Sequence, residues 1–322
     1  LDIDRDTPDP VPGFSYYKRD AQGVPTGYLL EGAATLAMDE LNAITEDVIV
    51  DGTAHVIDVL NSYGVTSVFD AGAIGEPDSL LAVLRRVEEA GDMTVRIVGS
   101  YLQAEPQGFE QAVANTMKWQ QNVRGGNFHY RMLKIMLDGT VEGRTAAMFE
   151  DYQGEPGNKG KLVFTPAQTK RMVADAAGAN IDVHIHALGE RAVREALDAM
   201  EAARDAHAGS SSRYTLCHLQ VIRDEDLQRF AELEVIAQST PLWAAYDVYG
   251  KQFVSDDQFS RYWRFKSLDE LGVRLTWGSD FPSSGAGMAG MSPVLQMEIG
   301  HTRQERGQAD ALVQPRKSER LD

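Results

Sequence analysis

Three residues whose side chains bind metals or move protons stand at the ends of short apolar runs in this sequence. They are His186, His218 and Asp280, and each closes a run rich in β-branched or aromatic residues. Imidazole binds a borderline metal such as zinc, and a carboxylate can bind the metal or carry a proton during hydrolysis. The spacings of 32 and 62 residues suit one and then two strand–helix units. We therefore expect all three side chains at one mouth of a parallel barrel.

Further polar residues share the faces of these predicted strands. Alternate side chains of a strand point the same way, so His184 lies one layer below His186, and Lys134 shares a face with Asp138. A single histidine at a strand end is usually structural, and Asp280 before Phe-Pro could equally be a loop or helix cap. Lys134 differs, because an ammonium in an apolar run needs a partner or an altered charge state. The joint occurrence favours a functional site.

Composition limits the class of protein. The chain has 322 residues, of which 43% are hydrophobic, and it carries a net charge of −17 with a pI of about 4.8. Such a chain is globular, and its charge repels nucleic acid and anionic membranes. The only cysteine, Cys217, excludes an intrachain disulfide framework and is expected to pack in the barrel wall. We expect a small-molecule substrate, no nucleic-acid or membrane partner, and no particular oligomeric state.

Predicted strands and helices alternate along the chain, which indicates an α/β fold with a parallel sheet. Seven strands are one short of a closed (β/α)8 TIM-type barrel. We interpret residues 1–322 as a single barrel domain, with an irregular segment over 1–50 and βα units over 51–300. The predicted strands are 65–70, 94–101, 132–138, 181–187, 214–219, 235–240 and 274–280. The predicted helices are 53–62, 78–90, 111–122, 166–178, 190–206, 224–233 and 267–271.

The first residues, Leu-Asp-Ile-Asp-Arg-Asp, include no initiator methionine and no signal peptide. They read like the interior of a longer protein, so a removed leader would leave no trace. This leaves localisation open, with the cytoplasm slightly favoured.

At the level of motifs, the sequence resembles the amidohydrolase superfamily, in particular its amidohydrolase family 3 or YtcJ-like branch. The resemblance covers almost the whole chain, and the order of the motifs makes it specific. The matching stretches are residues 20–31, 134–140, 143–147, 186–193, 217–220 and 278–282.

The resemblance implies a metal-dependent hydrolase on a (β/α)8 barrel, with one or two divalent metal ions and zinc as the expected metal. His186 and His218 would be metal ligands from the fifth and sixth strands, and Asp280 the eighth-strand carboxylate. Lys134 would be the fourth-strand lysine, which many relatives carbamylate with CO₂ to bridge two metals. The family's first-strand His-x-His pair and its small β-domain are absent, and Glu190 replaces the usual Asp.

The function expected from these residues is hydrolysis of an amide or other non-peptide C–N bond by a metal-activated hydroxide, with Asp280 moving the proton. His184 or His218 would stabilise the oxyanion. Trp243 and Trp277 could line an apolar substrate pocket or only pack the barrel. Arg144 could bind a substrate carboxylate or brace its loop. The alternatives are hydrolysis of another bond, such as an ester or a cyclic urea, and a non-catalytic ligand-binding barrel.

Overall fold

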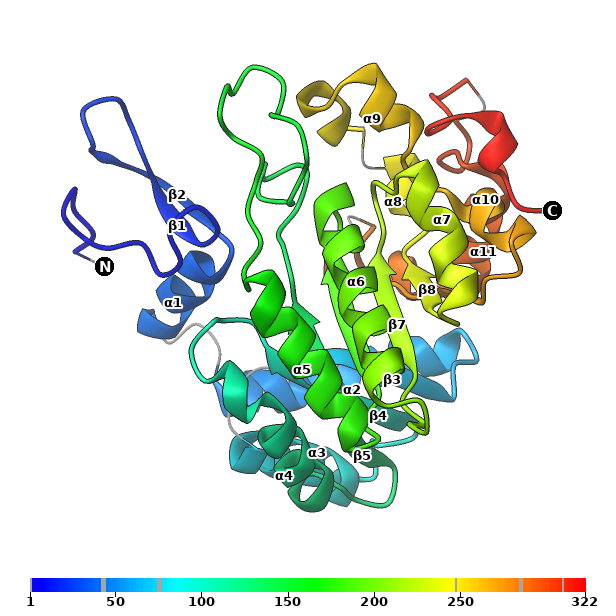
Figure 1. Cartoon of the computed structure of the whole chain (residues 1–322). Helices are drawn as coiled ribbons and strands as arrows, with labels where there is room; N and C mark the ends of the chain where they lie inside the picture. The colour runs from blue at the N-terminus through cyan, green and yellow to red at the C-terminus, as the bar shows by residue number, and fades with distance from the viewer. Residues whose placement is uncertain (1, 42–44, 74–76, 247, 284–285, 309) are drawn as a thin grey trace.

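A curled sheet of seven parallel strands forms the centre of the molecule (Figure 1). The computed structural model describes residues 2–41, 45–73, 77–246, 248–283, 286–308 and 310–322. All seven predicted strands are present and pair in sequence order. They are β3 (Ser67–Ala73), β4 (Arg96–Gln103), β5 (Phe128–Met136), β6 (Val183–Ala187), β7 (Tyr214–His218), β8 (Ile236–Ser239) and β9 (Leu275–Trp277).

Helices connect these strands, as the alternation in the sequence predicted. The major ones are α2 (Glu46–Ser62), α3 (Pro77–Ala90), α4 (Ala112–Asn122), α5 (Pro166–Gly178), α6 (Glu190–Ala206), α7 (Asp224–Glu232) and α10 (Phe265–Glu270). Two predictions, α5 and α6, match to the residue. Helix α2 begins seven residues earlier than predicted, because Thr45 caps it by accepting the backbone N–H of Val48.

Further helices lie in the loops that follow strands and in the C-terminal region. They are α8 (Trp243–Tyr246), α9 (Asp256–Ser260), α11 (Pro293–Thr302) and the 3₁₀ turns η1 (Phe109–Gln111), η2 (Gly250–Phe253), η3 (Gly287–Met291) and η4 (Lys317–Glu319). Among the described residues, no helix combines the length and apolar character that crossing a membrane requires.

The main core lies between the sheet and the helices α5 and α6, where apolar residues of β5, β6 and β7 are buried. Strand β6 is buried at every position, as expected for a central parallel strand covered on both faces. A second apolar cluster, which includes Leu188, Tyr262 and Trp263, is built from loops that follow the strands. The strand ends that carry the candidate residues therefore lie between two packed layers.

The N-terminal segment contradicts the prediction of an irregular stretch over residues 1–50. It forms an antiparallel hairpin, β1 (Tyr16–Arg19) and β2 (Pro25–Leu30), followed by helix α1 (Gly32–Glu40). The hairpin projects beside the long loop between β5 and α5 (Figure 1). Asp20 accepts the N–H groups of Gln22 and Val24 to close its turn. These strands were missed because they are short and contain only one fully buried residue between them, with no regular alternation of buried and exposed positions.

The sheet has two open edges. Among the described residues, strands β3 and β9 each pair with one neighbour and not with each other, so the seven-stranded sheet is curled but not closed.

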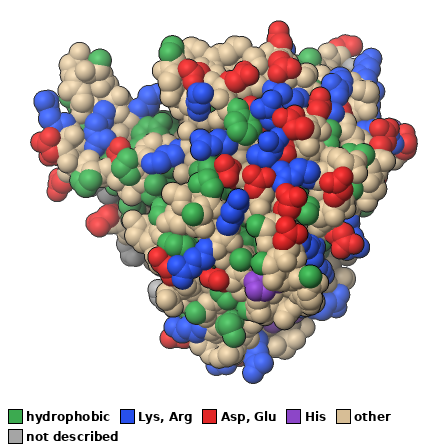
Figure 2. Space-filling model, in the orientation of Figure 1, with side chains coloured by type: hydrophobic (Ala, Val, Ile, Leu, Met, Phe, Trp, Pro, Cys, Tyr) green, Lys and Arg blue, Asp and Glu red, His purple; other side chains and the backbone are tan. Residues whose placement is uncertain are grey.

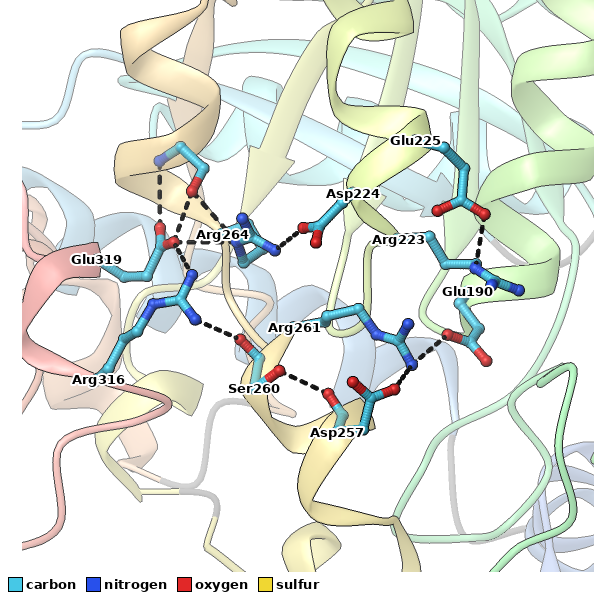
Figure 3. A network of polar contacts seen from close by, with 11 residues as sticks. Glu190, Arg223, Asp224, Glu225, Asp257, Ser260, Arg261, Arg264, Arg316 and Glu319 are labelled. Carbon is cyan, nitrogen blue, oxygen red and sulfur yellow. Dashed lines mark hydrogen bonds and ion pairs between the residues drawn. The ribbon is translucent and has the colours of Figure 1, made fainter.

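A polar network fastens the C-terminal segment to the loops of the sheet (Figure 3). The Arg264 guanidinium contacts Glu319 at 3.0 Å and Asp224 at 2.6 Å. Nearby, Arg261 lies 3.4 Å from Glu190 at the start of α6. On the face shown in Figure 2, basic and acidic side chains are interspersed, so that face carries no uniformly basic patch.

Candidate functional site

Strands β5, β6 and β7 place four polar side chains at neighbouring positions. In the register of the sheet, Lys134 lies opposite His184, and His186 lies opposite Cys217. His218 ends β7 one position further along. Since all three strands run parallel, these side chains gather at the carboxyl end of the sheet, as predicted for a barrel mouth.

Lys134 lies at the centre of this group and has only 4% of its surface exposed. Its Nζ donates to the Sγ of Cys217 at 2.9 Å and lies 3.1 Å from the Nδ1 of His184. Cys217 is thus buried in the sheet, as expected, and its thiol contacts the site. An ammonium can only donate, so His184 accepts at Nδ1 and carries its proton at Nε2.

His186 and His218 stand against each other, with ring centroids 4.4 Å apart. The His186 Nε2 lies 3.2 Å from the carbonyl oxygen of Gly139. Because a carbonyl oxygen only accepts, Nε2 holds the proton and Nδ1 keeps its lone pair. The His218 Nδ1 is buried and has no hydrogen-bond partner among the described residues. Two imidazole nitrogens are therefore available as ligands.

Burial keeps these imidazoles neutral. It lowers the pKa of His186 to about 3, with a further contribution from the charge of Lys134. Burial also holds the pKa of His184 and of His218 well below the usual range, again with a contribution from Lys134. The neutral imidazole is the form that binds a metal.

Asp280 belongs to the same electrostatic group, although it comes from the loop after β9. Burial raises the pKa of its carboxyl, and the charge of Lys134 opposes that rise. Its charge also acts on the Cys217 thiol, whose pKa burial raises to about 11. Asp280 and His218 both have positive φ angles, 48° and 73°. A non-glycine residue in this region costs about 1–3 kcal/mol and is enriched at functional sites.

Asp138 lies beside these residues, although no function was predicted for it. Its side chain is fully buried and accepts the backbone N–H groups of Ala147, Leu188 and Gly189 at 2.8–3.0 Å. One carboxylate oxygen lies 3.6 Å from the Nε2 of His186. Burial raises the pKa of the carboxyl to about 7, against these three N–H groups. Its position four residues after Lys134, on the same strand face, was the available signal.

The predicted substrate-binding residues divide into two groups. Trp243 stacks on the His218 ring with centroids 5.2 Å apart, and Trp277 packs edge-on against Phe265 at 4.8 Å. Arg144 forms an ion pair with Glu155 at 3.0 Å and stacks on a phenylalanine of η2. These contacts favour the interpretation that Arg144 braces its loop.

The donor set fits a divalent metal in kind, because two neutral imidazoles offer free nitrogens beside a carboxylate. Among the described residues, no three His, Cys, Asp or Glu side chains lie together in an arrangement that would hold a metal ion. A metal bound by His186 and His218 therefore needs additional ligands.

The model of the amidohydrolase family matches residues 1–321. The chain belongs to the amidohydrolase family. It is 29% identical over 246 residues to the exoenzymes regulatory protein AepA of Pectobacterium carotovorum subsp. carotovorum, covering 75% of this chain and 51% of that protein. It is 25% identical over 286 residues to the putative amidohydrolase YtcJ of Bacillus subtilis (strain 168), covering 87% and 51%. The chain thus spans about half the length of these amidohydrolase-family relatives.

One relative carries a named reaction, and solved structures support the fold. The N-substituted formamide deformylase of Arthrobacter pascens is 24% identical over 288 residues, covering 85% of this chain and 51% of that protein. An uncharacterized metal-dependent hydrolase from Pyrococcus furiosus superposes with a TM-score of 0.70 at 20% identity, covering 95% of this chain and 58% of that one. Its counterpart from Pyrococcus horikoshii OT3 gives 0.68 at 22%, covering 92% and 55%. These structures establish the amidohydrolase-type barrel fold.

Proposed function

We propose that this chain is the catalytic barrel portion of a metal-dependent hydrolase that cleaves an amide or another non-peptide C–N bond. The observation that carries the proposal is the placement of Lys134, His186 and His218 at neighbouring positions at the carboxyl end of the parallel sheet, with the two imidazole rings 4.4 Å apart and Asp280 in the loop after β9. Membership of the amidohydrolase family supports it, and so does the similarity to a formamide deformylase.

His186 and His218 would hold the metal through their free nitrogens, with Asp280 and carbamylated Lys134 as further ligands and zinc as the first metal to test. When bound, a divalent metal supplies Lewis acidity, which lowers the pKa of a coordinated water toward neutrality. Carbamylation would convert the buried ammonium of Lys134 into an anion, which would remove the cost of burying an uncompensated cation.

The protein's own groups would move the proton and hold the substrate. Asp280 accepts the proton of the attacking water at a carboxylate oxygen and then delivers it to the leaving amine nitrogen. His184 carries its proton at Nε2, since Nδ1 faces Lys134, so it can donate a hydrogen bond to the developing oxyanion. Trp243, stacked on His218, and Trp277 offer apolar surface to a non-polar substituent of the substrate.

The first experiment measures metal content and hydrolysis together. The wild-type chain and the H186A, H218A and D280N variants are loaded with Zn²⁺, dialysed and analysed by plasma mass spectrometry. They are then assayed against matched amide, formamide and ester substrates. We expect the wild-type chain to retain about one or two equivalents of metal, both histidine variants to lose it, and D280N to lose hydrolysis by at least about 100-fold.

Two results would contradict the proposal. Full turnover by D280N would remove Asp280 from the reaction, and equal metal retention by H186A would remove His186 from the site. Preferential cleavage of the ester, or of a cyclic urea, would keep the hydrolase but change the bond.

A non-catalytic ligand-binding barrel is the second candidate, favoured by the lack of a ready three-ligand group among the described residues. It predicts no metal and no turnover in any of the proteins.

A further inference from the structure

We propose that Asp138 is a positioning residue that sets the tautomer and the ring orientation of His186, an inference that rests on the function proposed above. Asp138 follows β5 and touches neither the expected metal ligand atom nor the substrate surface. It would act through its hydrogen bonds to the loops around His186 and through a carboxylate oxygen 3.6 Å from the His186 Nε2, which together would fix where His186 carries its proton and hence which nitrogen it offers to a metal.

The carboxylate of Asp138 joins two loops at the mouth of the sheet. Oδ1 accepts the N–H of Leu188 at 3.0 Å, and Oδ2 accepts those of Gly189 at 2.8 Å and Ala147 at 2.9 Å. Leu188 and Gly189 lie between His186 and the start of α6, whereas Ala147 belongs to the loop after β5. One buried side chain therefore fixes the exit of β6 relative to the loop that carries Gly139.

Close packing leaves these loops little freedom to shift. A Cβ added at Gly189 would lie 2.2 Å from the carbonyl oxygen of Ala147, and one at Gly139 would lie 2.1 Å from the Oγ1 of Thr145. Backbone atoms and a short side chain form these contacts, rather than the mobile ends of long side chains. The carbonyl of Gly139, which lies 3.2 Å from the His186 Nε2, is thus held in place by surroundings that Asp138 connects.

Both groups that face the His186 Nε2 are acceptors. The Gly139 carbonyl lies at 3.2 Å and the Asp138 Oδ1 at 3.6 Å. Two acceptors on one side of the ring favour the tautomer with the proton at Nε2, which leaves the Nδ1 lone pair free. A partner on the far ring nitrogen that orients a metal-binding histidine typically contributes about 10–100-fold in metal affinity.

The substitution D138N tests this arrangement because its amide must place an NH₂ group where one oxygen stood. At the Oδ2 position the NH₂ would oppose two backbone N–H groups, and at the Oδ1 position only one. The second orientation is less costly, and it directs a donor toward the His186 Nε2. We therefore expect D138N to move the proton to Nδ1 in part of the population and to block the nitrogen that a metal would use.

Asp182 provides a matched control at the opposite end of the same strand. It precedes β6, is also buried, and accepts the backbone N–H of Arg213 at 2.9 Å and its Nη2 at 2.6 Å. D182N therefore removes a comparable set of hydrogen bonds far from the mouth of the sheet. A purely structural effect of losing a buried carboxylate would be the same in both variants.

The tautomer of His186 is measured by ¹⁵N NMR on the metal-free chain, with H186Q identifying its signals among the seven histidines. We expect Nε2–H in the wild-type chain and in D182N, and an added Nδ1–H population in D138N. If His186 of the wild-type chain carries its proton at Nδ1, the inference is wrong. The wild-type spectrum alone therefore tests the inference, even if D138N does not fold. An unchanged tautomer in folded D138N would overturn it as well.

Binding of Zn²⁺ alone gives the second readout. We expect D138N to bind about 10–100-fold more weakly than wild type and D182N to bind within about twofold. Equal Zn²⁺ affinity in D138N and D182N would refute the role of Asp138 while leaving the proposed hydrolase intact. Absence of Zn²⁺ binding in the wild-type chain would refute the proposed function, and the tautomer measurement would still decide the role of Asp138.

Discussion

Replacement of Lys134 by methionine should stabilise the metal-free chain while removing its ability to bind a metal. The Lys134 ammonium is 4% exposed and donates only to the neutral side chains of His184 and Cys217. Burying an ammonium costs several kcal/mol, whereas a hydrogen bond from a charged donor returns about 1.5–3 kcal/mol.

The cost of burying the ammonium exceeds what its hydrogen bonds return, so the methionine variant should be the more stable protein. Methionine fills much of the same volume without a charge, so the substitution removes a desolvation penalty of several kcal/mol for the buried ion and loses the hydrogen bonds that the ammonium donates. The variant also loses the attraction between Lys134 and the Asp280 carboxylate and the hydrogen bond that Lys134 donates to His184, and both losses reduce that gain. We therefore expect K134M to increase the free energy of unfolding by about 1–3 kcal/mol.

Urea unfolding of the metal-free proteins, followed by circular dichroism, measures the effect. The control is K118M, because Lys118 is an exposed lysine of α4 and its loss should change stability by no more than about 0.5 kcal/mol. With Zn²⁺ and bicarbonate added, the wild-type chain should gain about 2.7 kcal/mol at a hundredfold excess over Kd, and K134M should gain none. A metal-free K134M less stable than wild type would refute this reasoning about the buried ammonium.

Two further predictions concern groups outside the metal ligands. Asp70 accepts a hydrogen bond from Tyr130, and burial raises the pKa of its carboxyl. The folded state therefore favours the protonated carboxyl, so the contribution of Asp70 to the free energy of unfolding is present at low pH and is lost as pH rises through the folded-state pKa. D70N should therefore match wild type near pH 3 and be more stable near pH 7 in urea titrations, and a pH-independent difference would contradict this. Glu319 is 2% exposed and bonds Arg264 and Ser267, so E319A should lower the free energy of unfolding by about 3–5 kcal/mol and speed proteolysis of the C-terminal segment. Unchanged thermal unfolding of E319A would show that this network contributes little.

The seven strands were predictable from the sequence because most of them are buried runs of β-branched and aromatic residues, and helices with clear apolar periodicity separate them. The grouping of Lys134, His186 and His218 was predictable for the same reason, since the ends of parallel strands meet at one edge of the sheet. Asp280 was expected at the end of the last strand, whereas β9 ends at Trp277 and Asp280 lies in the loop that follows.

Other features depend on contacts between distant parts of the chain. The exposed hairpin of residues 16–30 has no burial pattern to reveal it, and α8 and α9 are too short for helical periodicity to show. The direction of the Cys217 Sγ toward Lys134 and the three N–H partners of Asp138 depend on side-chain geometry between elements up to 83 residues apart. Sequence periodicity indicates on which face of a strand a side chain lies, but not which residue of another element it contacts.

In the part of the chain that the structure describes, the outer edges of β3 and β9 are open, and they bear on how copies of this chain meet in solution. Each presents a row of backbone N–H and C=O groups that can pair with another strand, and Phe69 on β3 is 39% exposed beside that row. The net charge of −17 makes copies repel one another, but salt at about 1 M shortens the screening length to about 3 Å. The colloidal behaviour of the protein is therefore tied to ionic strength, with charge repulsion at low salt opposing strand-to-strand association at high salt.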